Sequence, residues 1–215
     1  MEAGVLKFGD GEGICRILRE EVANGTGLGR IIGGGAGMVG RSFGVSRVPV
    51  VKNQAIPAYD PRAIKGIGIT YATSTMGADH TMGYSIATNI LNVGGSLDPM
   101  SKDGQVELSR NLQIATAAID STGMCLFIAF AALDDDTCLP ALIDLINARF
   151  GLSLTGDDVT NLGKAILKTE KAFNEKAGFG KEDDRLPEFF STEKLPPHNV
   201  VWDYTGEEID SFWNF

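Results

Sequence analysis

Cysteine and histidine are scarce in this sequence. Its 215 residues include three cysteines and two histidines. The cysteines, Cys15, Cys125 and Cys138, are odd in number and far apart, so they predict neither a disulfide framework nor a self-contained zinc site. Cysteines without partners are typical of a reducing compartment, and we therefore expect a cytoplasmic protein.

Long apolar runs and an excess of basic residues are also missing. The longest apolar candidate, Met124 to Leu133, is well short of the roughly 18 residues that a membrane helix needs, and we expect it in the core. Met1 to Gly4 shows no basic region followed by an apolar one, as a signal peptide would. The 28 acidic and 19 basic residues give a formal net charge of -9, which repels phosphate backbones and argues against nucleic-acid binding.

The composition that remains is that of a folded protein, 43% hydrophobic and 22% charged. Residues 48–56 form a short β-branched stretch, but no βαβ alternation is visible, so the expected fold class is mostly α. We place a domain boundary near residue 50, with a partial helical domain over 1–50 and a helical C-terminal domain over 51–215. Apolar residues at helical spacing or capping residues predict helices over 10–23, 82–92, 105–119, 140–150 and from 155 onward.

Gly35 to Gly40 matches the pattern G-x-G-x-x-G, which in dinucleotide-binding folds holds a pyrophosphate at a helix N-terminus. That function requires a preceding strand and an acidic residue about 20 positions later. Only Arg30 to Ile32 is strand-like before the glycines, and Asp60, at the required spacing, lies in a turn beside Pro61. Close helix packing through small residues is therefore the favoured interpretation.

The two histidines differ in their surroundings. His198 lies between Pro197 and Asn199 in a polar segment, and we expect it at the surface. His80 lies in the stretch from Met76 to Gly83, whose small residues let a backbone approach a ligand closely. A single histidine is more often structural than functional, so the stretch by itself leaves both roles open.

The six residues from Asp120 to Cys125 follow a predicted helix and precede the apolar run. A carboxylate near a buried run needs a hydrogen-bond donor, and Gly123 allows an unusual backbone angle or a close approach. Cys125 is then a buried thiol or a metal ligand. The alternative is a joint between helices, in which Asp120 caps, Gly123 permits packing and Cys125 fills space. One cysteine cannot decide, because an iron–sulfur cluster usually needs four thiolates.

Three stretches together resemble consecutive landmarks of the aldehyde ferredoxin oxidoreductase family, in order and in spacing. They are Gln54 to Arg62, Tyr71 to Thr81 and Asp120 to Cys125. The segment from Phe173 to Pro196 is similar to that family's C-terminal end, and Gly4 to Asp10 is similar to an internal segment. The resemblance covers nearly the whole chain. It implies helical C-terminal domains of that family's type, with residues 1–50 as the remnant of its middle domain.

Members of this family hold tungsten, or sometimes molybdenum, on two pterin dithiolenes and carry one [4Fe-4S] cluster. They oxidise aldehydes to carboxylic acids and pass the electrons to ferredoxin, while some relatives reduce an aromatic thioester. The resemblance therefore implies part of an oxidoreductase with both cofactors, an aldehyde substrate and ferredoxin as a partner.

The resemblance also implies roles for five residues. Asp120 would bind the amino or ring nitrogens of one pterin, because a carboxylate accepts hydrogen bonds from adjacent donors. Gly123 and Met124 would bring backbone groups against the same pterin. Cys125 would be one thiolate ligand of the cluster. His80 would lie near the metal and assist proton transfer.

Several parts of the family pattern are not found in this sequence. They are the domain that cradles the pterins, three further cluster cysteines, a first Asp-x-x-Gly element and a catalytic glutamate. Met1 falls where the family continues inside a helix, so we expect a truncated product or one partner of a split enzyme, inactive alone. The face that meets the missing part should expose apolar surface and favour self-association into a homo-oligomer. The alternative is a stand-alone helical scaffold or interaction protein that has kept the fold.

Overall fold

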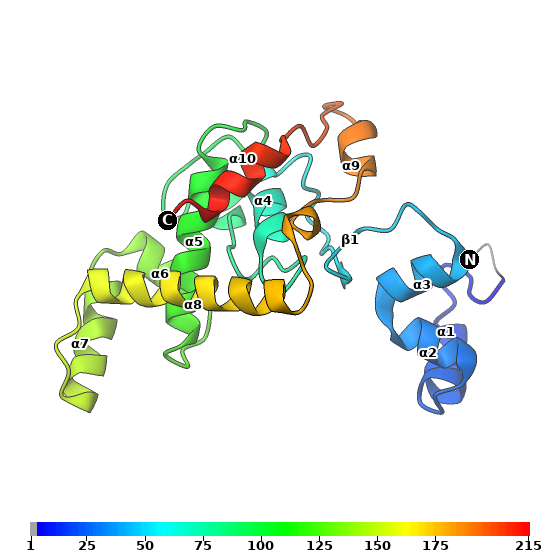
Figure 1. Ribbon diagram of the computed structural model, residues 1–215, viewed down its shortest axis with the longest axis horizontal. Helices are drawn as coiled ribbons and strands as arrows, with labels where there is room; N and C mark the ends of the chain where they lie inside the picture. The colour runs from blue at the N-terminus through cyan, green and yellow to red at the C-terminus, as the bar shows by residue number, and fades with distance from the viewer. Residues whose placement is uncertain (1–3) are drawn as a thin grey trace.

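Helices account for nearly all the regular structure of residues 4–215, the part of the chain that the computed structural model describes (Figure 1). The mostly α fold class is therefore confirmed; residues 1–3, where the predicted first domain begins, lie outside the described residues. No helix within 4–215 is both long enough and apolar enough to cross a membrane. The elements in chain order are α1 (Gly11–Ile17), η1 (Leu18–Val22), α2 (Gly27–Gly33), α3 (Gly35–Phe43), β1 (Val50–Val51), β2 (Gln54–Ala55), α4 (Lys65–Thr73), η2 (Ala87–Leu91), α5 (Gln105–Asp120), α6 (Ile128–Asp134), α7 (Cys138–Phe150), α8 (Gly156–Lys176), η3 (Lys181–Asp183), α9 (Phe189–Thr192), α10 (Gly206–Asp210) and η4 (Ser211–Trp213).

The first three α-helices form a group that lies to one side of the molecule (Figure 1). Asp10 caps α1, since its Oδ1 accepts a hydrogen bond from Gly13 N at 2.8 Å. The π-helical η1 continues α1 to Val22, which confirms the predicted helix over residues 10–23. Residues 44–49 then lead to β1 without helix or strand, and the boundary near residue 50 stays a prediction.

The G-x-G-x-x-G pattern lies entirely within α3 and does not form a phosphate-binding loop. The preceding element is α2, and no strand precedes the pattern in the described residues. An ideal Cβ on Gly37 would lie 2.9 Å from Asn53 Oδ1, and one on Gly40 would lie 2.4 Å from Val48 Cγ2. These glycines let α3 approach the segment that leads into the hairpin, as the packing interpretation expects.

Residues 48–56 form a two-stranded antiparallel hairpin in which Val50 pairs with Ala55. The turn residues Lys52 and Asn53 have φ angles of 48° and 65°. Positive φ at both central residues is the requirement of the tight turns that match the twist of paired strands. The polar interruption within the β-branched stretch is therefore the turn itself.

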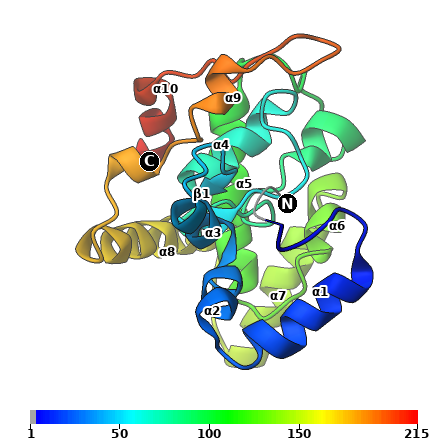
Figure 2. The same cartoon turned by 90° about the vertical axis from the view of Figure 1, so that its right-hand side faces the viewer.

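The centre of the molecule is built on α4, α5 and α8 (Figures 1 and 2). All nine residues of α4 are buried, and α5 packs against both α4 and α8. The predicted capping box at the start of α8 is confirmed, because Asp158 N donates to Thr155 Oγ1 and Thr155 N donates to Asp158 Oδ2. Where α8 crosses α5, an ideal Cβ on Gly163 would lie 2.1 Å from Ile114 O.

The C-terminal segment beyond α8 completes the core rather than forming a free tail. Trp202 and Phe212 are almost fully buried and pack with Ile69 and Ala72 of α4. His198, by contrast, is exposed in a turn, as expected. Trp202 and Phe212 therefore anchor this acidic segment in the core.

The predicted helix over residues 82–92 is wrong over much of its length. Only Ala87–Leu91 is a regular helical element, as the π-helical η2. Ser85 N donates to Gly83 O at 2.7 Å, so a tight turn precedes it. An ideal Cβ on Gly83 would lie 2.7 Å from Gln113 Cγ, which shows how closely the backbone approaches α5. The turn at Gly83 allows this close packing against α5, and a local sequence pattern carries no information about such packing.

Candidate functional site

His80 lies on the loop that follows α4, residues 74–83. The adjacent Asp79 is buried, and its Oδ2 accepts hydrogen bonds from Thr81 Oγ1 and Met82 N, both at 2.7 Å. A buried carboxylate with two donors holds a turn firmly. These two hydrogen bonds close the turn from Asp79 to Met82 around His80.

The imidazole of His80 forms a cluster of three rings with two tyrosines, whose own centroids are 6.0 Å apart. Its centroid is 5.7 Å from that of Tyr59 and 5.8 Å from that of Tyr84. The two phenol oxygens are 2.8 Å apart and share a hydrogen bond. Burial, and then the hydrogen bond to Tyr59, raises the pKa of Tyr84 to about 12, so this phenol stays protonated at neutral pH. Nδ1 of His80 is buried and has no hydrogen-bond partner among the described residues, so no competing bond occupies it.

These three rings line a pocket of about 300 Å³ between the loop, α5 and α6. Its polar groups come from the two tyrosines, His80 and two threonines, and its remaining walls are apolar. A concave, mainly apolar site with a few polar groups is typical of sites for small organic ligands. The lining residues are Tyr59, His80, Thr81, Tyr84, Ala87, Leu112, Thr116, Leu126, Phe127, Ala129, Phe130 and Leu133.

The wall formed by α6 is half-buried rather than part of the core. No residue of α6 is buried, and Phe127 immediately before it is 77% exposed. The expectation that Met124 to Leu133 lies in the core is therefore wrong. A second pocket of about 340 Å³ separates α6 from parts of α5 and α8, so the apolar side chains of α6 are not enclosed.

The segment from Asp120 to Cys125 begins at the last residue of α5. Gly123 has a φ of 74°, and no atom lies within 4 Å of an ideal Cβ there, so the glycine is required by conformation and its surroundings are open. Asp120 is exposed, and its carboxylate accepts no hydrogen bond within residues 4–215. Desolvation raises the pKa of Asp120, and the negative charge of Asp79 raises it further. The Gly123 N–H donates to Asp120 O at 3.1 Å, so the groups open to a ligand here are the Asp120 carboxylate and the Gly123 carbonyl.

His80 and this segment flank the same pocket. Leu126 directly follows Cys125 and lines the pocket together with His80. Thr116, one helical turn before Asp120 on α5, lines it too. His80 thus lines the pocket directly, whereas residues 120–125 do not line it and lie next to it in the chain.

Cys125 is exposed, which contradicts its interpretation as a buried or space-filling thiol. Cys15 is also exposed and Cys138 is half-buried. Within the part of the chain that the structure describes, no group of three or more histidine, cysteine or acidic residues is placed to hold a metal. The exposed Cys125 thiol and Asp120 carboxylate are open to a ligand, and their roles toward a cluster and a pterin stay predictions.

Tyr59 and Tyr84 are components of the pocket that sequence reasoning did not single out. Tyr59 lies inside one of the stretches that carry the family resemblance, but it received no role. Tyr84 follows His80 by four positions in a segment that was predicted as a helix. Neither signal could reveal that the two phenols meet, because the contact joins residues on different loops.

Comparison with known proteins shows the family of this chain. A family model described as aldehyde ferredoxin oxidoreductase, domains 2 and 3, matches residues 2–212. The tungsten-containing aldehyde ferredoxin oxidoreductase of Pyrococcus furiosus is 36% identical over 198 residues, 91% of this chain and 32% of that protein. The enzyme of the same name from Pyrococcus horikoshii is 34% identical over 194 residues, 89% of this chain and 31% of that protein. The chain thus spans about a third of the length of these relatives.

Proposed function

Because this chain belongs to the aldehyde ferredoxin oxidoreductase family, we propose that it supplies part of the active site of an enzyme that oxidises aldehydes to carboxylic acids. The observation that carries the proposal is the pocket flanked by His80 on one loop and by the Asp120 to Cys125 segment on another. A substrate in this pocket would meet apolar walls and the hydroxyl groups of two tyrosines.

Conversion of an aldehyde and water to a carboxylic acid releases two protons and two electrons. When bound, a tungsten or molybdenum ion on two pterin dithiolenes would supply the two-electron oxidation, and a [4Fe-4S] cluster would pass the electrons to ferredoxin. We assign one proton to His80, whose imidazole lines the pocket. The phenols of Tyr59 and Tyr84 would orient the carbonyl oxygen, since at least one of their two hydroxyl protons is free beyond the shared bond.

The cofactor roles fall to the end of α5. Asp120 would accept hydrogen bonds from the amino or ring nitrogens of a pterin, and Gly123 and Met124 would bring backbone groups against it. Cys125 would be one of four cluster ligands. Support comes from the exposure of Asp120 and Cys125 and from the open space at Gly123.

The remaining partners follow from the same proposal. The part of the family that this chain does not match would supply the other cluster thiolates and the pterin cradle, in the same polypeptide or in a second one. The exposed side chains of Phe127, Leu145 and Phe150 fit a face covered by that part or by a second copy. The described residues contain no disulfide, in keeping with a reducing cytoplasm.

Metal analysis tests the cofactor roles. The chain is co-expressed with the upstream part of a relative, and tungsten, molybdenum and iron are measured in the purified complex. We expect Asp120→Ala to lower tungsten or molybdenum and Cys125→Ser to lower iron. Asp134→Ala at the exposed end of α6 and Cys15→Ser at another exposed thiol are the matched controls. Metal contents equal to wild type in both test variants would refute the cofactor roles.

Aldehyde oxidation tests the role of His80. In the same complex His80→Asn should reduce kcat by about 100-fold or more, because a positioned acid or base contributes roughly that factor. His198→Asn, on the exposed turn, should match wild type. A wild-type rate for His80→Asn removes the histidine from the mechanism. A complex that binds no metal in any variant favours the stand-alone scaffold.

A further inference from the structure

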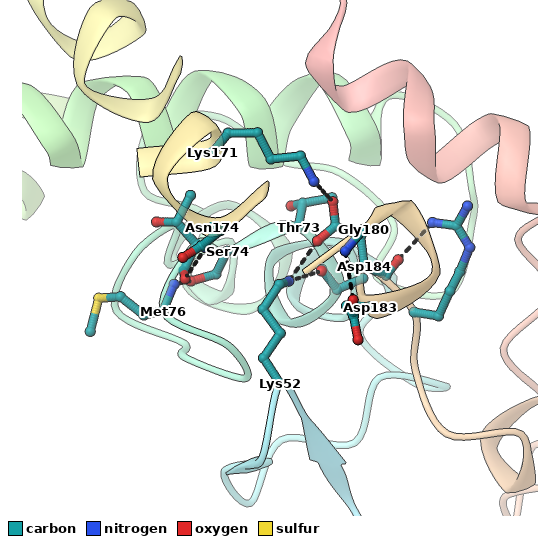
Figure 3. A network of polar contacts seen from close by, with 12 residues as sticks. Lys52, Thr73, Ser74, Met76, Lys171, Asn174, Gly180, Asp183 and Asp184 are labelled. Atoms are coloured by element: carbon teal, nitrogen blue, oxygen red, sulfur yellow. Dashed lines mark hydrogen bonds and ion pairs between the residues drawn. The ribbon is translucent and has the colours of Figure 1, made fainter. Parts of the chain in front are cut away.

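A buried ion-pair network lies behind the loop that carries His80 (Figure 3). At its centre the Asp184 side chain, 4% exposed, is 2.6 Å from Lys52 Nζ through Oδ1 and 2.8 Å from Lys171 Nζ through Oδ2. Oδ1 has no hydrogen bond of regular geometry, so its contact with Lys52 is an ion pair. The indole N–H of Trp213 also donates to Oδ2, at 3.3 Å. The network joins the hairpin, α8 and the C-terminal segment.

Burial makes this arrangement costly. The Lys52 side chain is 5% exposed, and desolvation lowers its pKa against the opposing effect of Asp184. Apolar residues of similar volume usually replace a buried ion pair without loss of stability, so such a pair is weak evidence for a stabilising role. We therefore explain the presence of this ion pair by the geometry that it imposes on its surroundings.

Lys52 and its neighbours hold one side of the loop. Lys52 Nζ donates to Ala72 O, near the end of α4, at 3.0 Å. In the same hairpin Val51 O accepts from Ala78 N at 3.4 Å. Gly77 has a φ of 96°, and an ideal Cβ there would lie 2.8 Å from Val51 O. The hairpin therefore touches the two residues that precede Asp79 and His80.

Helix α8 holds the other side. Thr75 Oγ1 donates to Glu170 Oε2 at 2.6 Å, and Asn174 Nδ2 donates to Thr75 O at 2.8 Å. Lys171 lies between these two positions on α8 and pairs with Asp184. Asp184 thus ties the hairpin to α8 across the loop that both of them contact, as the labelled side chains in Figure 3 show.

We propose that Asp184 is a positioning residue. By holding Lys52 against α8 it fixes residues 74–79, and through them it sets the position of the His80 imidazole in the pocket. The catalytic consequence rests on the proposed function of His80. The positional consequence does not, and it can be measured on this chain without any cofactor.

The test on the chain alone uses NMR of the histidine ring protons. His198→Gln leaves His80 as the single histidine, so its signals need no further assignment. In this background we expect Asp184→Asn and Lys52→Met to shift or broaden the His80 signals while circular dichroism keeps its helical form. Asp203→Asn is the matched control. It removes the ion-pair partner of another buried lysine, Lys65, and this pair does not involve the hairpin, α8 or residues 74–79. It should leave the His80 signals unchanged.

A second variant keeps the test decisive if Asp184→Asn fails to fold. The double substitution Lys52→Met and Asp184→Leu replaces the pair by apolar groups, which a buried site tolerates. A folded double variant with displaced His80 signals supports the proposal. Wild-type His80 signals in the folded variants overturn it.

The catalytic consequence is tested by measuring aldehyde oxidation in the co-expressed complex. Asp184→Asn should lower kcat by about 10- to 100-fold, because a displacement of about 1 Å at a reacting group has effects of this order. KM should change much less, since Asp184 does not line the pocket. If His80→Asn keeps the wild-type rate, the catalytic role of His80 fails, and the NMR result still decides whether Asp184 positions it.

Discussion

At the crossing of α5 and α8, a glycine-to-alanine substitution should change stability in the direction opposite to that expected from helix propensity. Alanine is about 1 kcal/mol more favourable than glycine inside a helix, so Gly→Ala in a helix normally stabilises. At Gly163 the new Cβ would lie 2.1 Å from Ile114 O and 2.9 Å from its carbonyl carbon. These are backbone atoms of the facing helix, which cannot rotate away as a side chain can. We therefore predict that Gly163→Ala destabilises the protein.

The magnitude follows from the distances. Ordinary van der Waals contact for a Cβ begins near 3.4 Å, so the helices would have to separate by more than 1 Å at their crossing. Overpacking of a close-packed interior costs about 1–3 kcal/mol, and the intrinsic preference for alanine offsets about 1 kcal/mol of it. Because the clash at Gly163 is with backbone atoms, we take the upper part of that range, about 2–3 kcal/mol, and the net loss is then about 1–2 kcal/mol. For a chain of this size that corresponds to a fall in Tm of about 2–8 °C.

Thermal unfolding followed by far-ultraviolet circular dichroism measures this change. Gly156→Ala is the matched control, because Gly156 begins the same helix and has no atom within 4 Å of an ideal Cβ. Its Tm should equal or exceed that of wild type. If Gly163→Ala melts at or above the wild-type temperature, the close approach of the two helices is refuted.

Three shorter predictions address the pocket, the cap of α8 and the cofactor segment. The pKa of Tyr84 is raised from 10 to about 12 in the folded chain, so its contribution to stability is present below pH 10 and is lost as the pH rises from about 10 through about 12. Urea unfolding should show the advantage of wild type over Tyr84→Phe shrinking in that window, and a constant difference would contradict the assignment. Thr155→Ala removes the cap of α8 and should cost about 1 kcal/mol, or about 2–4 °C in Tm, whereas Thr160→Ala on its exposed face should change little. Cys125→Ser should remove one of the thiols that a thiol-specific reagent modifies in the native chain, and an unchanged number of modified thiols would show that Cys125 is covered.

Local patterns predicted several helix ends correctly because the interactions that set them are local. Asp10 and Thr155 each accept a hydrogen bond from a backbone N–H three residues later. The geometry of such a cap is complete within four residues, so it can be recognised without knowledge of the rest of the fold. The turn at Lys52 and Asn53 interrupts its β-branched stretch in the same local way.

Patterns failed where a distant segment decides the outcome. The apolar residues of 124–133 were expected in the core, yet α6 is open on two sides because α5 and α8 do not close around it. Hydrophobicity states which side chains gain from burial, but it does not state whether a neighbour is present to bury them. The turn at Gly83, set by contact with α5, was missed for the same reason.

Sequence alone determined the mostly α fold class, the local caps and, through family resemblance, the candidates His80 and Asp120 to Cys125. Tertiary structure decided that His80 lines one pocket with Leu126, the residue after Cys125. It also decided that Tyr59 and Tyr84 meet beside His80, and that Asp184 lies between Lys52 and Lys171. The physical reason is the distance along the sequence between the residues that interact. Caps and helical periodicity involve residues within a few positions of one another, whereas the ion-pair network joins residues from 13 to more than 100 positions apart. The path of the folded chain sets those distances, and no local pattern contains them.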